Sequence, residues 1–391
     1  MRIYDCQINH LTNPLGYQME STVFSWKVAD TAGKHQQSAR LRVACAPDMT
    51  DVICDTGAAA LDSIATALSL PLKPRTRYYW TVEITADNGD HAISQVNWFE
   101  TAKREEPWHA KWITCQAHPR HPVFTKQIAV SGTLESARLY ICGLGLYEAS
   151  FGGTKIGNEF LTPYSNDYDR WVQYQTYDVT ELLAEGENEL TVQLADGWFR
   201  GSCGAWGIKN QYGTQTKLLI QLEITRTDGS IQTVLSDKTW QWSNDGPIRF
   251  ADNKDGEIVD AAAQPSYRAY AAETSHPVTP TASNNVPVTE HEHFCAKLLT
   301  TPSGKTVLDF GQNMAGYVSF RLEAKAGQKI TLRFGEMLDA EGEFTQKNIQ
   351  LSNKKITTPL QQVVYTCKDG INDYKTTFAV FGFQYVQVEA D

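Results

Sequence analysis

The amino-acid sequence predicts an all-β protein built from three consecutive β-sandwich domains. Short runs rich in Val, Ile, Thr, Tyr, Phe and Trp, bounded by Gly, Asn, Asp or Pro, recur along nearly the whole chain, which is typical of strands. Helical periodicity is scarce. Two loop-like segments divide the 391 residues into units of roughly 100, 175 and 100 residues, which are sizes that suit β-sandwiches.

The predicted elements follow this pattern from end to end. The clearest strands are predicted at 22–28, 38–45, 77–85, 136–143, 147–153, 217–225, 317–324 and 384–390. Turn dipeptides separate several of them, as at 87–90 and 227–230. Only two short helices are predicted, at 59–70 and at 179–184, where Thr180 is a candidate N-cap.

Changes in composition set the predicted domain boundaries. Residues 103–112 form a charged, Pro-containing linker, and residues 271–293 are rich in Pro, Thr and Ser with little periodicity. The predicted domains are therefore 1–103, 108–275 and 290–391. In the first, Trp26 and the aromatic residues of 77–85 indicate core packing, and we assign this domain no chemistry.

Charge and composition argue against several classes of function. The net charge of −10 and the lack of a long basic run argue against a nucleic-acid partner. No stretch approaches the roughly 20 apolar residues of a membrane span, and residues 1–20 lack the pattern of a signal peptide. The eight cysteines are scattered and never form C-x-x-C, which favours free thiols in a reducing compartment. We expect a soluble, cytoplasmic protein without a membrane partner.

Two stretches of the second unit carry the residue types that recognise sugars. These are "SNDYDR" at 165–170 and "LADGWFRGSCGAWGIKNQYG" at 194–213. Carboxylates and amides bind vicinal hydroxyls, an Arg donates to oxygen pairs, and aromatic faces cover the apolar side of a pyranose. The candidate carbohydrate-binding residues are Asn166, Asp167, Asp196, Trp198, Arg200, Trp206 and Tyr212.

The residues alone leave an alternative open, in which Trp198 and Phe199 are core and the glycines turn a corner. The side-chain oxygens of Asn166 and Asp167 are in addition candidate ligands for a Ca²⁺ ion.

No catalytic motif is found. The sequence contains no G-x-S-x-G, H-E-x-x-H, Walker A or dinucleotide fingerprint, and "DFGQN" at 309–313 lacks the other kinase motifs. The histidines at 118–121 and 291–293 lie in predicted connectors and are interpreted as solvated, and Cys203 as an inert thiol. Carboxylate pairs identify nothing among 45 Asp and Glu residues.

The order of the motifs closely resembles the bacterial α-L-rhamnosidases. The resemblance rests on "NPLG", "FSW" and "RTRYYWTVEI" in the first unit, and on "YQTYDVTELLAEGENELTVQLADGWFRG" and "GPIRFADNKDGEIVDA" in the second. It continues through "LDFGQNMAGYVSF", "RFGEMLDAEGEF" and "FAVFGFQYVQV" and so covers essentially the whole chain. The "YQTYDVT…DGWFRG" block is its most specific part.

The resemblance implies a fibronectin-III-like sandwich, a jelly roll of carbohydrate-binding type and a concanavalin-like sandwich. In the family an (α/α)6 barrel follows, with the catalytic acids in a stretch like D-x-x-x-R-x-E-x-x-x-W-x-G-D, and terminal α-L-rhamnose is removed by inversion. The chain ends at Asp391, where the barrel is expected, and that stretch is absent from it. No catalytic residue can therefore be assigned.

We expect the non-catalytic N-terminal part of an α-L-rhamnosidase-like glycoside hydrolase, which binds carbohydrate and supports the catalytic domain. Its implied partners are L-rhamnose or a rhamnosylated glycoside, and the missing barrel. Ca²⁺ is implied because some relatives bind rhamnose with it on the jelly roll. The alternatives are a stand-alone carbohydrate-binding protein and a purely architectural fragment. Within 194–213, Arg200, Trp206 and Tyr212 are favoured to face a ligand, and Trp198 to be partly structural.

Overall fold

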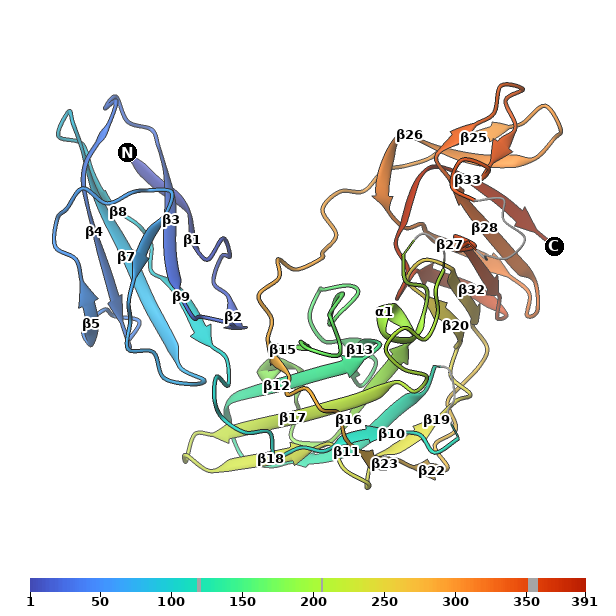
Figure 1. Ribbon diagram of the computed structural model, residues 1–391, viewed down its shortest axis with the longest axis horizontal. Helices are drawn as coiled ribbons and strands as arrows, with labels where there is room; N and C mark the ends of the chain where they lie inside the picture. The colour runs from blue at the N-terminus through green and yellow to red at the C-terminus, as the bar shows by residue number, and fades with distance from the viewer. Residues whose placement is uncertain (118–120, 205–206, 351–357) are drawn as a thin grey trace. The chain divides into compact units, whose positions relative to one another are not determined.

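The computed structural model describes residues 1–391 except 118–120, 205–206 and 351–357. The chain divides into two compact units. One contains Met1–Trp108 together with Tyr174–Asp178 and Thr281–Val286, and the other contains His109–Gln173, Val179–Pro280 and Pro287–Asp391. Strands dominate both units, as predicted (Figure 1). No helix in the described ranges is long and apolar enough to cross a membrane.

The first unit is a sandwich of two sheets around an aromatic core. One sheet has the order β1 (Arg2–Ile8), β3 (Thr22–Ala29), β6 (Thr66–Leu68). The other has the order β2 (Leu15–Tyr17), β9 (Asn97–Thr101), β7 (Arg77–Ala86), β4 (Gln36–Ala44), β5 (Val52–Asp55), and β8 (His91–Ile93) pairs with β7. Phe24 packs edge-on against Trp80 with ring centroids 5.0 Å apart, and Trp26 is 3% exposed, as its predicted core position requires. The unit also contains β15 (Gln173–Asp178) from Tyr174 onward, and β24 (Thr281–Ala282), which pairs with it.

The N-terminal half of the second unit is another two-sheet sandwich. In one sheet β23 (Ala272–Thr274), β10 (Trp112–Thr114), β17 (Lys217–Arg226) and β12 (Leu134–Leu144) are neighbours, and β18 (Ile231–Leu235) pairs with β17. The other has the order β14 (Thr154–Lys155), β13 (Leu146–Phe151), β16 (Gly186–Ala195), β11 (Val123–Val130), β19 (Gln241–Ser243), β22 (Ala269–Tyr270). Alternating residues of β16 and β17, among them Leu190, Val192 and Leu222, are fully buried.

The C-terminal half of the second unit is a third sandwich. Its large sheet has the order β20 (Ile248–Asp252), β21 (Gly256–Asp260), β31 (Gln362–Thr366), β28 (Lys329–Gly335), β33 (Phe381–Ala390), β26 (Thr306–Gly316), β25 (Lys297–Thr300). The small sheets are β27 (Ser319–Ala324) with β32 (Gly370–Lys375), and β29 (Met337–Leu338) with β30 (Phe344–Thr345). The hairpin β20–β21 falls within the predicted 108–275 domain but pairs through β21, in parallel, with β31.

Of the two predicted helices, one is absent from the structure and the other is a single turn. Residues 59–70 form no helix, and within them β6 pairs with β3, so this prediction is wrong. Residues 179–184 contain a single 3₁₀ turn, η1 (Thr180–Leu182). Thr180 does not cap this turn. Its hydroxyl instead accepts a hydrogen bond from the Ala137 amide at 2.8 Å, which ties the turn to β12.

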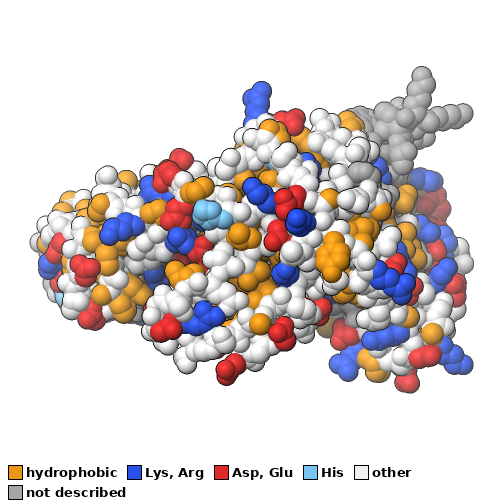
Figure 2. All heavy atoms as spheres, turned by 90° about the horizontal axis from the view of Figure 1, so that it is seen from below, with side chains coloured by type: hydrophobic (Ala, Val, Ile, Leu, Met, Phe, Trp, Pro, Cys, Tyr) orange, Lys and Arg blue, Asp and Glu red, His pale blue; other side chains and the backbone are white. Residues whose placement is uncertain are grey.

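Charged side chains of both signs are interspersed over the face of the molecule in Figure 2, where Lys and Arg alternate with Asp and Glu. The eight cysteines are all unpaired, and four of them are buried. "DFGQN" lies within β26, and the pairing of β26 with β33 shifts register between Asp309 and Met314.

Candidate functional site

A sharp turn follows β16 and carries the first of the predicted site residues. The one-turn helix α1 (Gly197–Arg200) begins directly after Asp196. Gly197 has a φ of +53°, and a Cβ on it would lie 2.7 Å from the Leu146 side chain, so only glycine fits there. The Asp196 carboxylate is fully buried, 3.6 Å from the Arg200 guanidinium. Both predicted sugar-binding groups therefore take part in an internal ion pair.

Trp198 packs at the corner between the two sandwiches of the second unit. It lies half-buried against an apolar cluster that contains Leu146 and Ala195 from one sandwich and Ala251 and Phe378 from the other. This position is structural at least in part. The indole is not an open platform for a sugar ring.

Tyr168 brings the two predicted stretches together. Its fully buried ring packs against Phe199, with centroids 5.2 Å apart, and against Tyr212, with centroids 5.1 Å apart. Its hydroxyl donates to the Tyr164 carbonyl at 3.3 Å, and burial raises the pKa of this hydroxyl well above its ordinary value. The loop 165–170 and the loop 199–212 therefore share one aromatic base.

Asn166 and Asp167 have opposite surroundings. The buried Asn166 amide donates to the carbonyls of Pro163 and Tyr164, and its oxygen accepts from the Gln173 amide nitrogen and side chain at 3.2 and 3.1 Å. Asp167 has a side chain that is 53% exposed, and its carboxylate lies 4.0 Å from the Arg170 guanidinium.

The predicted Ca²⁺ site finds no matching donor set here. Ca²⁺ takes six to eight oxygen ligands, whereas, of the two predicted ligands, the Asn166 oxygen already accepts internal hydrogen bonds and Asp167 alone has an exposed carboxylate. In the part of the chain that the structure describes, no three His, Cys, Asp or Glu side chains are grouped so that they could hold a metal ion. Calcium binding therefore stays a prediction without support from this geometry.

Two buried aspartates, Asp252 and Asp255, accept hydrogen bonds from Ser202 and Lys209 of the 194–213 stretch. We call this pair the aspartate clasp. The Asp252 carboxylate accepts from the Ser202 amide at 2.6 Å and from the amides of Lys254 and Asp255, both at 2.9 Å. The Asp255 carboxylate accepts from Lys209 Nζ at 2.6 Å and from Ser202 Oγ at 3.2 Å.

The clasp also reaches the C-terminal sandwich. The Leu360 amide, next to β31, donates to the Asp255 carboxylate at 2.9 Å, and the Gln362 amide donates to the Asp255 carbonyl at 3.1 Å. One aspartate thus connects a loop of the middle sandwich to a strand of the last one. The stretch 194–213 is in large part a structural corner, the alternative that the sequence left open.

Sequence reasoning missed Tyr168, Asp252 and Asp255. "DNKDG" at 252–256 has the composition of a tight turn, which is the signal that could have drawn attention to it. Of the remaining predicted residues, Tyr212 is half-buried at the edge of the aromatic base, and Trp206 lies outside the described residues.

Three family models match the chain in succession. The Rha78A-like N-terminal immunoglobulin domain matches residues 3–105, the α-L-rhamnosidase N-terminal domain matches 132–297, and the bacterial α-L-rhamnosidase concanavalin-like domain matches 299–391.

Relatives and solved structures agree with the models. An α-L-rhamnosidase of Formosa agariphila is 27% identical over 98% of this chain and 45% of its own length, and one of Streptomyces avermitilis is 36% identical over 64% and 25%. The crystal structure of the Aspergillus terreus α-L-rhamnosidase is 28% identical and matches 99% of this chain and 47% of its own, with a TM-score of 0.87. The Streptomyces avermitilis enzyme complexed with L-rhamnose, 23% identical, matches 99% of this chain and 56% of its own, with a TM-score of 0.84, which shows the shared fold.

The chain spans about half the length or less of the curated relatives it matches. The models account for most of it, in the order that the resemblance implies, and the three β-sandwiches of the structure follow one another in the same order, although the hairpin β20–β21 lies within the middle match and pairs in the last sandwich. The chain is made up of the immunoglobulin-like, N-terminal and concanavalin-like domains of the α-L-rhamnosidase family.

Proposed function

We propose that this chain binds carbohydrate and supports the catalytic part of an α-L-rhamnosidase, and that it does not itself hydrolyse glycosides. The identity of its three domains supports the proposal, and so does the lack of the family's acid-rich catalytic stretch in residues 1–391. The aspartate clasp supports the architectural part, because it fixes the corner between two sandwiches.

One observation carries the binding part: an exposed rim around the Tyr168 base, made of Asp167, Asp169, Arg170 and Tyr212. The first three are exposed, and the Arg170 side chain is 86% exposed. Tyr212 packs on the Tyr168 ring, and burial, together with the charges of Asp167 and Asp169, raises the pKa of its hydroxyl above the ordinary value. We name this group the loop rim.

The loop rim has the chemistry that a sugar requires. Carboxylates accept hydrogen bonds from hydroxyls, a guanidinium donates to ring and hydroxyl oxygens, and the Tyr212 ring offers an apolar face. The packed base beneath the rim fixes Tyr212 before binding, which lowers the entropy cost of association. We propose L-rhamnose, alone or at the end of a glycoside, as the ligand, since a relative of the same fold was crystallised with that sugar.

Titration calorimetry of the 391-residue chain with L-rhamnose tests this proposal. Tyr212→Ala should weaken binding about tenfold, because the ring face is lost, and Asp167→Asn should weaken it by a similar factor. Tyr270→Ala is the matched control, since Tyr270 is 63% exposed on an edge strand outside the rim. Unchanged affinity in both rim variants would overturn the proposed site.

The same titration with a chelator tests the calcium prediction. Because the exposed rim offers few oxygen ligands, we expect EDTA to leave the affinity for L-rhamnose unchanged. Loss of binding in EDTA, restored by added Ca²⁺, would show instead that the cation takes part in the site.

A further inference from the structure

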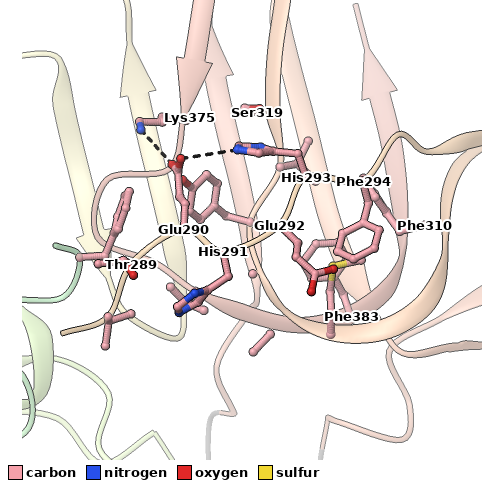
Figure 3. A pocket seen from close by; sticks show the side chains of 18 of the residues that line it. Thr289, Glu290, His291, Glu292, His293, Phe294, Phe310, Ser319, Lys375 and Phe383 are labelled. Carbon is pink, nitrogen blue, oxygen red and sulfur yellow. Dashed lines mark hydrogen bonds and ion pairs between the residues drawn. The ribbon is translucent and has the colours of Figure 1, made fainter. Parts of the chain in front are cut away.

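A pocket of about 470 Å³ lies in the second unit (Figure 3), and its described lining contains none of the loop rim residues. Residues 288–294, which we call the strap, have no regular secondary structure and line it together with β26 and neighbouring residues of the C-terminal sandwich. Its volume is in the range of sites that enclose small ligands.

The strap is anchored on both sides of the pocket. The Phe160 amide donates to the Val288 carbonyl at 2.9 Å. The Glu290 carboxylate accepts from Lys375 Nζ at 3.0 Å and from the Tyr317 hydroxyl, as the cluster at the top of Figure 3 shows in part. These two donors hold the pKa of Glu290 below its ordinary value, so the carboxylate stays charged.

The wall of the pocket is aromatic and rigid. Phe310 packs edge-on against Phe383 with centroids 5.4 Å apart, and Phe383 is buried against Phe334 at 5.1 Å. Phe294 on the strap is 38% exposed although it is large and apolar. The pocket thus has the exposed Phe294 ring on the strap, facing an aromatic wall of Phe310 and Phe383 that is packed in place.

Polar groups stand beside this wall without protein partners. Among the residues that the structure describes, neither Glu292 nor His291 makes a side-chain hydrogen bond or ion pair, and the Gln312 amide makes none either. Figure 3 shows Glu292 next to Phe294 and Phe310, whereas Glu290, His293 and Lys375 form a separate group. An anchored strap therefore holds the unpaired Glu292 carboxylate at the edge of the aromatic wall, whereas the His291 ring lies on the side of Thr289 (Figure 3).

We propose that this pocket binds a pyranose unit of a glycoside, as a second carbohydrate site separate from the loop rim. The apolar face of the sugar would lie on Phe294 and Phe310, and its hydroxyls would donate to the Glu292 carboxylate and pair with the Gln312 amide. The proposal shares its class of ligand with the proposed function and rests on it in that respect. The residues involved are different.

Met314 lines the pocket, so the NMR signal of its methyl group reports on binding at this site. The chain would be labelled at its methionine methyl groups and titrated with L-rhamnose and with methyl β-D-glucopyranoside, with Met314→Leu to assign the signal. We expect the Met314 signal to shift saturably with at least one of the two sugars. Phe294→Ala and Glu292→Gln should each raise the dissociation constant read from this shift about tenfold or more.

Two exposed positions serve as controls. Leu298→Ala removes an apolar side chain that is 70% exposed outside the pocket, and Glu341→Gln neutralises an exposed carboxylate in a turn, so both should leave the Met314 titration unchanged. A Met314 signal that neither sugar moves, or a shift that neither pocket variant weakens, would overturn the proposal. One further variant distinguishes binding at the pocket from binding at the loop rim. Tyr212→Ala should weaken the binding of L-rhamnose measured by calorimetry and leave the shift of the Met314 signal unchanged.

Discussion

Glu257 is a fully buried carboxyl group whose protonation is coupled to folding. It accepts hydrogen bonds from the Thr377 amide at 2.8 Å, the Phe378 amide at 2.5 Å and the Tyr374 hydroxyl at 2.7 Å. Burial outweighs these donors and raises the pKa of Glu257 from its ordinary 4.5 to about 7. The folded state therefore binds more protons than the unfolded state over this range, and the contribution of Glu257 to stability falls as the pH rises from 4.5 through 7.

Glu257→Gln should remove this pH dependence. The free energy of unfolding of the wild type, relative to that of the variant, should fall by about 2 to 3 kcal/mol between pH of about 5 and about 8. Denaturant unfolding at several pH values measures it, with Glu341→Gln as an exposed control. Parallel curves for the wild type and Glu257→Gln would contradict the assignment.

Asp255 is the residue whose loss should affect two sandwiches at once. Asp255→Asn removes the charge that pairs with Lys209 Nζ and weakens the acceptor for the Leu360 amide. We expect a loss of unfolding free energy on the order of 2 kcal/mol, with faster hydrogen exchange at the Leu360 amide. Asp373→Asn, at an exposed position on β32, should cost little. Equal stability of the two variants would show that the clasp is not an important link.

At the level of elements, the parallel pairing of β21 with β31 depends on Gly256. Its φ is +110°, and a Cβ there would collide with the backbone of Gln362. Gly256→Ala should therefore destabilise the protein by about 2 kcal/mol or more. Gly304 has a φ of +85° and open space around it, so Gly304→Ala measures the backbone strain alone, about 1 kcal/mol. Matching losses in the two variants would mean that the close approach to β31 is unimportant.

The sequence predicted strands well because their signal is local. Alternating apolar residues marked β3, β4, β7, β12, β17 and β33, and the structure confirms each. The helix predicted at 59–70 was wrong because Thr66–Leu68 gains more from pairing with β3 than a short isolated helix gains in water.

The candidate site was only partly predictable, because its contacts join residues that are far apart in the sequence. The loops 165–170 and 199–212 were correctly singled out by composition, but their meeting through Tyr168 is a long-range contact. The aspartate clasp depends on contacts between residues far apart in the sequence, such as Ser202 and Asp252, which are 50 positions apart, and no local sequence pattern indicates such a contact. The internal use of Asn166 and Asp196 was hidden for the same reason, because exposure is a property of the fold.

At the scale of the whole molecule, the chain consists of three β-sandwich domains of the α-L-rhamnosidase family within two compact units. Within the second unit, the hairpin β20–β21 and the aspartate clasp connect the middle and last sandwiches. We expect these two sandwiches to unfold together, because separating them would remove the Ser202 amide from the buried Asp252 carboxylate and the Lys209 charge from the buried Asp255 carboxylate. A single calorimetric transition for both is the expected result.

The most direct test of the account is an assay of the 391-residue chain with p-nitrophenyl α-L-rhamnopyranoside. Hydrolysis by inversion requires an acid and a base on either side of the glycosidic bond, and the chain lacks the family's stretch that supplies them. We predict that p-nitrophenol is released no faster than in buffer, whatever the concentration of protein or substrate. Robust, protein-dependent release from the purified chain would contradict the account.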